Sequence, residues 1–486
     1  MSKSILDLEP KEVWSNFHSL TQIPRPSKHE DKIQDFMVGY GQSLGLETIK
    51  DETGNVIIKK PATPGMENRM GVVLQGHLDM VPQKNSDKDH DFTTDPITTI
   101  IDGDWVRADK TTLGSDNGIG VASAMAVLAS TELVHGPIEA LFTCDEETGM
   151  TGANELKPGL LDGQIMLNLD SEDEGELYIG CAGGIDSTGV FTPTFEDVPS
   201  DTVAFNLTVK GLKGGHSGLD INLGRGNANI ILNTLLMTAA GKFGIRLANI
   251  SGGNLRNAIP REAIAVVTIP AENQKNFIQF VIEFDAIVKE EFSKADEGVS
   301  VSCEITTVPE KVIDLKTQSG LFEAVSKCPN GTIAMTADMP DVVETSSNLA
   351  IVRLKNDKIE IAALSRSSVD AAKTKLAEQI CGVFTNAGAI ANSSGEYPGW
   401  KPNVNSPILK TMKAVYNNKF GKVPEVKVIH AGLECGILAG AYPDMDMISF
   451  GPTIRHPHSP DEKVNIKTVG LFWDYLVETL KEIPTK

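Results

Sequence analysis

Five side chains of the kinds that bind divalent metal ions stand at or just after an apolar run or a glycine-rich turn: His77, Asp116, Glu147, Asp170 and His458. They are spread over most of the 486 residues of the chain. Side chains that follow the strands of one α/β sheet meet at the same edge of that sheet, where such proteins bind their ligands. The five positions therefore predict a metal site at the edge of an α/β sheet.

Two further acidic residues stand beside these ligand candidates. Asp79 lies two residues after His77 at the end of an apolar strand, so the two side chains share a face. Asp79 is therefore placed to accept the second ring N–H of His77. Glu146 directly precedes Glu147. In an extended chain they would point in opposite directions, so one carboxylate would bind metal while the other faces water. A metal pair with a spare carboxylate indicates a hydrolase.

Two of these positions have alternative interpretations. Asp116, in the stretch LGSDNGIG, stands where a helix begins, so it is also a good helix N-cap. His456 lies two residues before His458 in HPHSPDE, and spacing alone does not choose between the two histidines. Nitrogen and oxygen ligands without a thiolate suit zinc, manganese or cobalt.

Alternating helix and strand patterns predict the elements that would position this site. Helical spacing over residues 30–45 is followed by short apolar strands, and a small-residue helix precedes the strands IEALFTC and IMLNLD. After CAGGID the pattern changes to half-exposed strands with amphipathic helices, and the last hundred residues return to the first pattern. We predict a doubly wound α/β catalytic domain in two parts, 1–186 and 401–486, interrupted by an inserted α+β lid domain over 187–400.

The composition argues against two classes of partner. A formal net charge of −21 is opposite to the basic surface that binds nucleic acids or anionic membranes. No apolar stretch is long enough to span a bilayer, and the first residues carry no secretory signal pattern. The six cysteines are dispersed without a CxxC pair, which is typical of reduced thiols. We expect a cytoplasmic protein with no nucleic-acid or membrane partner.

Several longer motifs can be compared with known families: QGHLDMVPQK, TTLGSDNGIG, EETGMTGA, NLDSEDEGE, GCAGGID, LKGGHSG, NAIPRE, HAGLECG and PHSPDE. Together they resemble the dinuclear-zinc aminopeptidase/carboxypeptidase family, and within it the aminoacyl-histidine dipeptidase branch. The resemblance runs from the first helix to the closing EIPTK. It implies a zinc-peptidase catalytic domain, a homodimer, and two divalent ions per subunit, zinc with cobalt or manganese as alternatives.

The resemblance also assigns roles to the ligand candidates. It implies that Asp116 bridges two metal ions and that the other ligands form two pairs: His77 with Asp170, and Glu147 with His458. Asp79 would orient His77. Glu146 would be the general base that takes a proton from the attacking water and the acid that delivers it to the leaving amine. A cis peptide bond is implied after Asp116.

The predicted lid would supply most of the substrate-binding residues. By resemblance, His216 stabilises the oxyanion and comes from the partner subunit, while Asn257 and Arg366 hold the C-terminal carboxylate of the substrate. Arginine is suited to that task because its planar fork binds a carboxylate through two hydrogen bonds. Three residues of HAGLECG are further candidates for the substrate pocket: His430, Gly432 and Glu434.

The expected activity is the metal-dependent hydrolysis of dipeptides with a free amino end, Xaa-His and carnosine-like dipeptides being preferred. The preference for histidine follows only from the resemblance. Two alternatives stay open: an amidohydrolase of N-acyl amino acids that uses the same metals and base, and a non-catalytic metal- or peptide-binding protein on the same fold.

Overall fold

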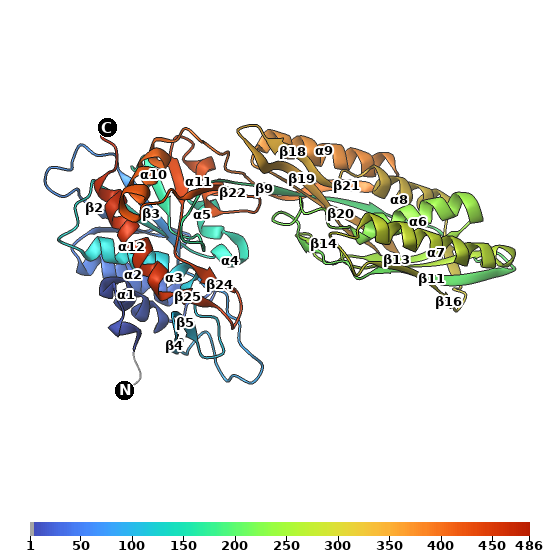
Figure 1. Cartoon of the computed structure of the whole chain (residues 1–486), viewed down its shortest axis with the longest axis horizontal. Coiled ribbons are helices and arrows are strands. Elements are labelled where there is room, and N and C mark those ends of the chain that lie inside the picture. The colour runs from blue at the N-terminus through green and yellow to red at the C-terminus, as the bar shows by residue number, and fades with distance from the viewer. Residues whose placement is uncertain (1–3) are drawn as a thin grey trace. The chain divides into compact units, whose positions relative to one another are not determined.

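The computed structural model describes residues 4–486, whose contacts divide them into two compact units (Figure 1). The first unit comprises the residues up to Gly180, Pro402–Val428 and Leu433–Lys486, and the second comprises Cys181–Lys401 and Ile429–Gly432. The second unit is therefore an insertion in the sequence of the first. Within residues 4–486 we find no helix with the length and apolar run that crossing a bilayer requires.

An eight-stranded mixed sheet forms the centre of the first unit. Its strand order is β1-β2-β6-β3-β7-β23-β8-β22. The strands are β1 (Glu47–Lys50), β2 (Val56–Lys60), β3 (Val72–His77), β6 (Ile138–Thr143), β7 (Ile165–Asn168), β8 (Glu176–Cys181), β22 (Glu425–Ile429) and β23 (Asp446–Ser449). Every residue of β3, β6 and β7 is buried, as near-continuous apolar strands in the middle of a covered sheet should be.

Helices surround this sheet. They are α1 (Lys11–Thr21), α2 (Asp31–Ser43), α3 (Ser115–Ala129), α4 (Glu146–Gly149), α5 (Thr151–Glu155), α10 (Pro407–Phe420), α11 (Glu434–Ala441) and α12 (Ile466–Lys481), with a short 3-10 turn at Ile5–Asp7. Helix α3 is buried on all sides between β3 and α1. Its glycines and alanines permit this, because small side chains let neighbouring backbones approach closely.

A four-stranded antiparallel sheet lies in the same unit, in the order β24-β25-β5-β4. Its strands are β4 (Thr99–Asp102), β5 (Trp105–Ala108), β24 (Ile454–Arg455) and β25 (Lys463–Asn465). The β4–β5 hairpin turns at Gly103, which has φ +60°, as the Asp-Gly pair in the sequence predicts. The segment between β24 and β25 carries the histidines of HPHSPDE.

The second unit is built on one nine-stranded sheet, in the order β16-β11-β15-β13-β19-β20-β9-β21 with β18 paired to β19. Its strands are β9 (Gly183–Phe191), β11 (Thr202–Lys210), β13 (Arg246–Gly252), β15 (Ala263–Pro270), β16 (Ser300–Thr306), β18 (Gly331–Thr336), β19 (Met339–Lys355), β20 (Lys358–Ser367) and β21 (Ile390–Tyr397). Two small pairs accompany it: β10 (Phe195–Asp197) with β17 (Lys311–Ile313), and β12 (Gly215–His216) with β14 (Ala258–Ile259).

Four helices cover this second sheet and enclose its core: α6 (Ala228–Phe243), α7 (Gln274–Glu291), α8 (Leu315–Lys327) and α9 (Asp370–Asn386). A short 3-10 turn, Ala271–Asn273, precedes α7. Burial alternates along β15, where Ala263 and Ala265 are buried while Ile264 is exposed, because only one face of the strand meets the helices. The predicted α/β fold with an inserted α+β part is confirmed.

Candidate metal centre

Four adjacent strands of the first unit end at the same edge of its sheet. Strand β3 is parallel to both β6 and β7, and β23 is parallel to β7. His77 is the last residue of β3, Glu146 and Glu147 follow β6, and Asp170 follows β7. Because parallel strands place their carboxyl ends together, segments far apart in sequence deliver these side chains to one place.

Asp116 comes from the start of α3 rather than from a strand. Gly114, with φ +71°, is the N-cap of this helix, and the backbone of Asp116 departs from helical geometry with φ −82° and ψ 110°. The Asp116 carboxylate lies against two histidine rings, which favours the ligand interpretation over that of a helix cap. The cis peptide bond that the resemblance implies after Asp116 is present, between Asp116 and Asn117.

Each carboxylate oxygen of Asp116 faces a histidine. Oδ1 lies 3.1 Å from His77 Nε2, and Oδ2 lies 3.1 Å from His458 Nε2. On one side Asp170 Oδ1 is 3.4 Å from His77 Nε2, and on the other Glu147 Oε2 is 3.0 Å from His458 Nε2. The ligand atoms therefore form two groups that share Asp116, each within 4.8 Å. This is the arrangement that a carboxylate bridging two ions would need.

The carboxylates of this cluster attract positive charge strongly. Hydrogen bonds to Asp116 and Glu147 raise the pKa of His458 to about 11. Burial alone would lower the pKa of His77, but the surrounding carboxylates, that of Asp170 above all, raise it well above its usual value. A cluster that holds protons so firmly on two ring nitrogens also favours a divalent cation in their place.

The donor set fits such a cation. All five candidate ligands offer nitrogen or oxygen atoms. The side chain of Glu147 is only 4 % exposed, and its buried Oε1 has no hydrogen-bond partner among residues 4–486. A buried carboxylate oxygen without a partner is costly unless a cation compensates it.

Asp79 links His77 to the segment that follows β6. Its Oδ1 lies 3.3 Å from His77 Nδ1. Its carboxylate also accepts the backbone N–H of Glu146 at 3.0 Å, that of Glu147 at 3.2 Å and the hydroxyl of Ser27 at 2.8 Å. Burial would raise the pKa of Asp79, but these interactions, led by His77, lower it to about 2. Asp79 is therefore an anion that can orient the imidazole.

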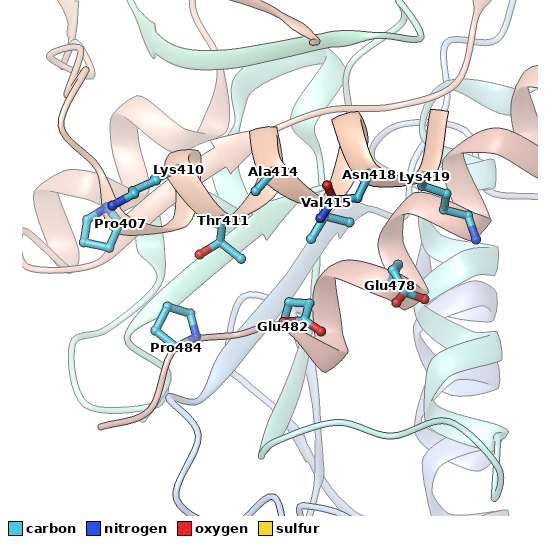
Figure 2. A pocket seen from close by; sticks show the side chains of 10 residues that line it. All are labelled: Pro407, Lys410, Thr411, Ala414, Val415, Asn418, Lys419, Glu478, Glu482 and Pro484. Atoms are coloured by element: carbon cyan, nitrogen blue, oxygen red, sulfur yellow. The ribbon is translucent and has the colours of Figure 1, made fainter. Parts of the chain in front are cut away.

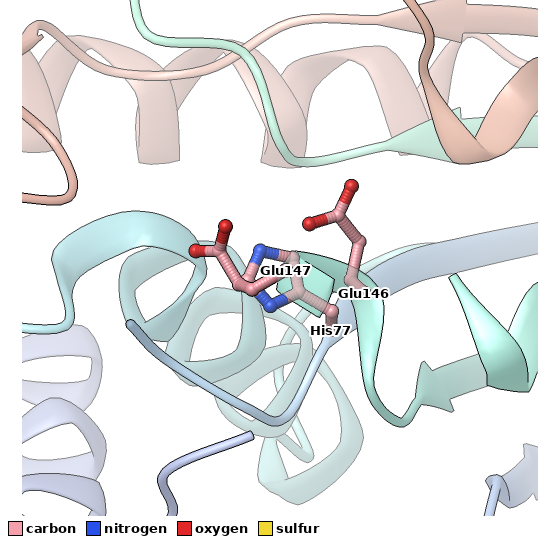
Figure 3. Close-up of side chains that lie close together, drawn as sticks. All are labelled: His77, Glu146 and Glu147. Carbon is pink, nitrogen blue, oxygen red and sulfur yellow. The ribbon is translucent and has the colours of Figure 1, made fainter. Parts of the chain in front are cut away.

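Glu146 and Glu147 begin the helical turn α4, after Asp145 has taken a left-handed conformation with φ +52°. The expectation of an extended chain with opposed side chains is therefore wrong, because Asp145 turns the backbone at the end of the strand. Both carboxylates group with His77 within 4.8 Å, and Figure 3 shows them on either side of its ring. Burial raises the pKa of Glu146 well above its usual value, as an acid–base catalyst requires.

The two histidines of HPHSPDE differ in their surroundings. His458 contributes to the metal-ligand groups found in residues 4–486, whereas His456 contributes to none of them. His456 is exposed. The structure therefore favours His458 over His456 as the ligand.

Glu434, at the start of α11, lies against the strands that deliver the ligands. It is 1 % exposed and accepts hydrogen bonds from Gln75 Nε2 of β3 at 2.6 Å and from Thr143 Oγ1 of β6 at 2.8 Å. Its Oε1 has no hydrogen-bond partner among the described residues. Burial raises the pKa of Glu434 to about 7.

The second unit brings three of the other predicted substrate residues together. His216 of β12 pairs with Ala258 of β14, directly after Asn257, whose carbonyl oxygen accepts the N–H of Ser217 at 2.8 Å. Arg366 of β20 is 4 % exposed and donates from Nε to Ser217 Oγ at 3.3 Å. His216, Asn257 and Arg366 are thus connected through one serine.

His430 belongs to the same unit. Its Nε2 lies 2.7 Å from Ser346 Oγ, and burial, followed by the charge of Arg366, lowers the pKa of His430 to about 3. His430 is therefore neutral at physiological pH. Gly432 ends the same short segment of the second unit, Ile429–Gly432, and is half-buried.

A groove of 820 Å³ lies between α10 and α12 (Figure 2). It is lined by Pro407, Lys410, Thr411, Ala414, Val415, Asn418, Lys419, Glu478, Glu482 and Pro484. None of the predicted site residues lines it.

Sequence reasoning missed the buried polar residues that support the cluster. Arg25 and Glu462 are each 2 % exposed and bind the segments that carry the ligands. Glu462 stands in the motif PHSPDE, which drew attention only for its histidines. An arginine between two prolines, as Arg25 is, carries no comparable signal.

Comparison with known proteins shows which family the chain resembles. The model of the family described as "Peptidase family M20/M25/M40" matches residues 73–482. The chain is 45 % identical over 479 residues to the cytosol non-specific dipeptidase of Escherichia coli K12, covering 99 % of each protein.

Comparison with solved structures also finds peptidases that share the fold of this chain. The aminoacylhistidine dipeptidase of Vibrio alginolyticus superposes with a TM-score of 0.95 at 48 % identity, covering 100 % of this chain and 99 % of that one. A tripeptidase of Staphylococcus aureus superposes with a TM-score of 0.55 at 16 % identity over 98 % of this chain and 99 % of that one, which shows a shared fold.

Proposed function

Because the chain belongs to peptidase family M20/M25/M40 and is therefore a peptide hydrolase, we propose that it is a metal-dependent dipeptidase. Its substrates would be dipeptides with a free amino end, including Xaa-His and carnosine-like dipeptides. The observation that carries the proposal is the Asp116 carboxylate, which presents one oxygen to each of two histidines, with Glu146 close by.

Two divalent ions would be held by the two ligand groups that share Asp116. We propose zinc, with cobalt or manganese as alternatives, because the donors are nitrogen and oxygen without thiolate. When bound, such ions supply Lewis acidity, which lowers the pKa of water and polarises the scissile carbonyl group. Asp79 would keep His77 in the tautomer that leaves Nε2 free to bind metal.

Glu146 would transfer the protons of the reaction. As a carboxylate it takes a proton from the attacking water, and as a carboxylic acid it delivers that proton to the nitrogen of the leaving amine. The raised pKa of Glu146 supports both steps, because the group must hold the proton between them. Its backbone N–H is fixed by Asp79, which limits the positions of the side chain.

The residues of the second unit would bind the substrate. Arg366 and Asn257 would hold the C-terminal carboxylate, and His216, supplied by the partner subunit of a homodimer, would stabilise the oxyanion. The Nδ1 atom of His216 accepts the N–H groups of Gly218 and Leu219, both at 3.1 Å. This leaves the proton on Nε2, from which the ring can donate. The pocket would also include His430, Gly432 and Glu434.

We place the protein in the cytoplasm, acting on small peptides and without nucleic-acid or membrane partners. The charge of −21 and the cytosolic dipeptidase among its relatives support this assignment.

A panel of substrates tests the proposed function. Chelator-treated protein would be assayed with β-Ala-His, Gly-His, Gly-Leu, an N-acetyl amino acid and a tripeptide, with and without zinc, manganese or cobalt. Cleavage that metal restores, confined to dipeptides with a free amine and fastest with C-terminal histidine, is the expected result. Cleavage of the N-acetyl compound alone would identify an amidohydrolase, and no turnover with any metal would leave only a binding protein.

A further inference from the structure

Glu462 holds the chain segment that carries Asp116. Its Oε2 accepts the N–H groups of Leu113 at 2.8 Å and Gly114 at 3.0 Å. Its Oε1 accepts the N–H of Ser115 at 2.7 Å, the hydroxyl of Ser115 at 2.6 Å and the N–H of Asp116 at 3.3 Å. One carboxylate thus binds four consecutive backbone N–H groups at the start of α3.

The same glutamate follows a second ligand in the sequence. Glu462 lies four residues after His458, in the segment between β24 and β25. The ring of His458 contacts Asp116 and Glu147 through Nε2, and its side chain is 53 % exposed. The hydrogen bonds of Glu462 therefore connect the exposed segment of His458 to the buried segment of Asp116.

Arg25 connects the segment bound by Glu462 to the end of β3. Its guanidinium donates to the carbonyl oxygens of Leu78 at 2.8 Å, Asp79 at 3.0 Å and Gly114. It thereby joins the end of β3, which carries His77, to the segment bound by Glu462. A Cβ added at Gly114 would lie 2.7 Å from Arg25 Nη2, so the close approach requires glycine here.

We propose that Glu462 is a positioning residue for the metal centre, which sets the Asp116 carboxylate between His77 and His458 and is assisted by Arg25. The inference rests on the proposed function, because it takes Asp116 and the two histidines as metal ligands. Glu462 acts through Asp116: it binds the backbone of that residue, while both carboxylate oxygens of Asp116 face the histidines. Groups that orient ligands typically change metal affinity or activity by about 10–100-fold when they are removed.

Substitution of Glu462→Gln tests this role. A glutamine keeps the size of the side chain, but its amide nitrogen cannot accept a hydrogen bond. Whichever way the amide turns, one pair of backbone N–H groups at the start of α3 loses its acceptor.

Glu139→Gln is the matched control. Glu139 is 6 % exposed, accepts the N–H groups of Asp162 at 2.9 Å and Gly163 at 2.8 Å, and pairs with Lys59. It lies near the start of β6, at the opposite end of that strand from the cluster. Both substitutions remove the charge of a buried glutamate that accepts backbone N–H groups in the same unit, but only Glu462 lies at the proposed metal ligands.

Three readouts separate positioning from stability. They are the zinc affinity of the metal-free protein, measured against a competing chromophoric chelator, the visible absorption spectrum of the cobalt-loaded protein, and thermal unfolding of the metal-free protein. Glu462→Gln should weaken zinc binding by about 10–100-fold and alter the cobalt spectrum. Glu139→Gln should leave both unchanged, and any effect of losing its ion pair with Lys59 should appear only in the unfolding temperature. Equal zinc affinities and equal spectra for the two variants would overturn the proposal.

Ser115→Ala keeps the test decisive if Glu462→Gln does not fold. It removes only the hydroxyl bound to Glu462 Oε1, and a smaller loss of zinc affinity with an altered cobalt spectrum is expected. Wild-type affinity and spectrum in this variant would then refute the role of Glu462. Failure of the proposed function would show in the unmodified protein, as the absence of metal-dependent dipeptide hydrolysis, whereas failure of this inference would show only in the variants.

Discussion

Metal binding should release protons from the two histidines, which makes the affinity depend on pH. The pKa of His458 is raised to about 11, and that of His77 is raised well above its usual value. Both rings therefore carry a proton on Nε2 at pH 7 to 8, and each must lose it to bind a cation. With one histidine in each ligand group, the affinity for each ion should rise about tenfold per pH unit, or roughly 1.4 kcal/mol.

Below pH 7 the dependence should become steeper for one of the two ions. Burial raises the pKa of Asp170 to about 7, so this ligand also gains a proton as the pH falls through that value. The ion held by His77 and Asp170 would then displace up to two protons, whereas the ion held by His458 and Glu147 would displace one.

Calorimetric titration of the metal-free protein with zinc measures the number of protons released. The titrations would be run between pH 6.5 and 8.5 in buffers of different ionisation enthalpy. We expect about one proton per ion at the upper end and a total that grows as the pH falls. His458→Gln should abolish the release associated with one ion only. Affinities that do not change with pH would mean that both rings are neutral in the metal-free protein, and the electrostatic reasoning would be refuted.

Four further predictions concern single residues. Glu146→Gln should lower kcat by about 10²–10⁴-fold without changing metal content, measured by steady-state kinetics and elemental analysis; unchanged kcat would exclude it as the base. Arg366→Lys should raise KM for dipeptides more than it lowers kcat, because lysine lacks the planar fork; an unchanged KM would remove Arg366 from the carboxylate site. Gly114→Ala should lower the free energy of unfolding by about 1–3 kcal/mol in urea titrations, because alanine is strained at φ +71°, and an unaffected midpoint would contradict this. The pKa of His430 is lowered to about 3 in the folded protein, so this ring gains a proton more readily in the unfolded chain. The free energy of unfolding should therefore fall as the pH drops from about 6.5 towards 3, and His430→Asn should make it less dependent on pH in that window.

The α/β architecture and the cluster could be predicted because both follow from local patterns. His77 and Asp170 each follow a short apolar run, and such runs become buried parallel strands whose ends converge. The resemblance supplied the pairing of ligands around Asp116, which strand ends alone do not specify. The choice between His456 and His458 needed the backbone of their loop, which spacing in the sequence does not contain.

Other features depend on contacts between distant segments. Glu462 and Ser115 are separated by most of the chain, and neither stands at the end of an apolar run. The apolar run before Glu146 predicts an extended chain, because a left-handed backbone such as that of Asp145 is uncommon for residues other than glycine. Helix α8 falls in a region, 285–330, that offers no motif.

The insertion of the second unit has a consequence for the order in which the protein folds. Strand β7 pairs with β23, which follows the whole of the second unit in the sequence, so the first sheet cannot be completed until the second unit has been synthesised. The nine strands of the second unit all precede residue 398, and this unit can assemble earlier during synthesis. Asp170 and Glu147 precede the second unit in the sequence and His458 follows it, so the proposed site for two ions can form only after the whole second unit has been synthesised.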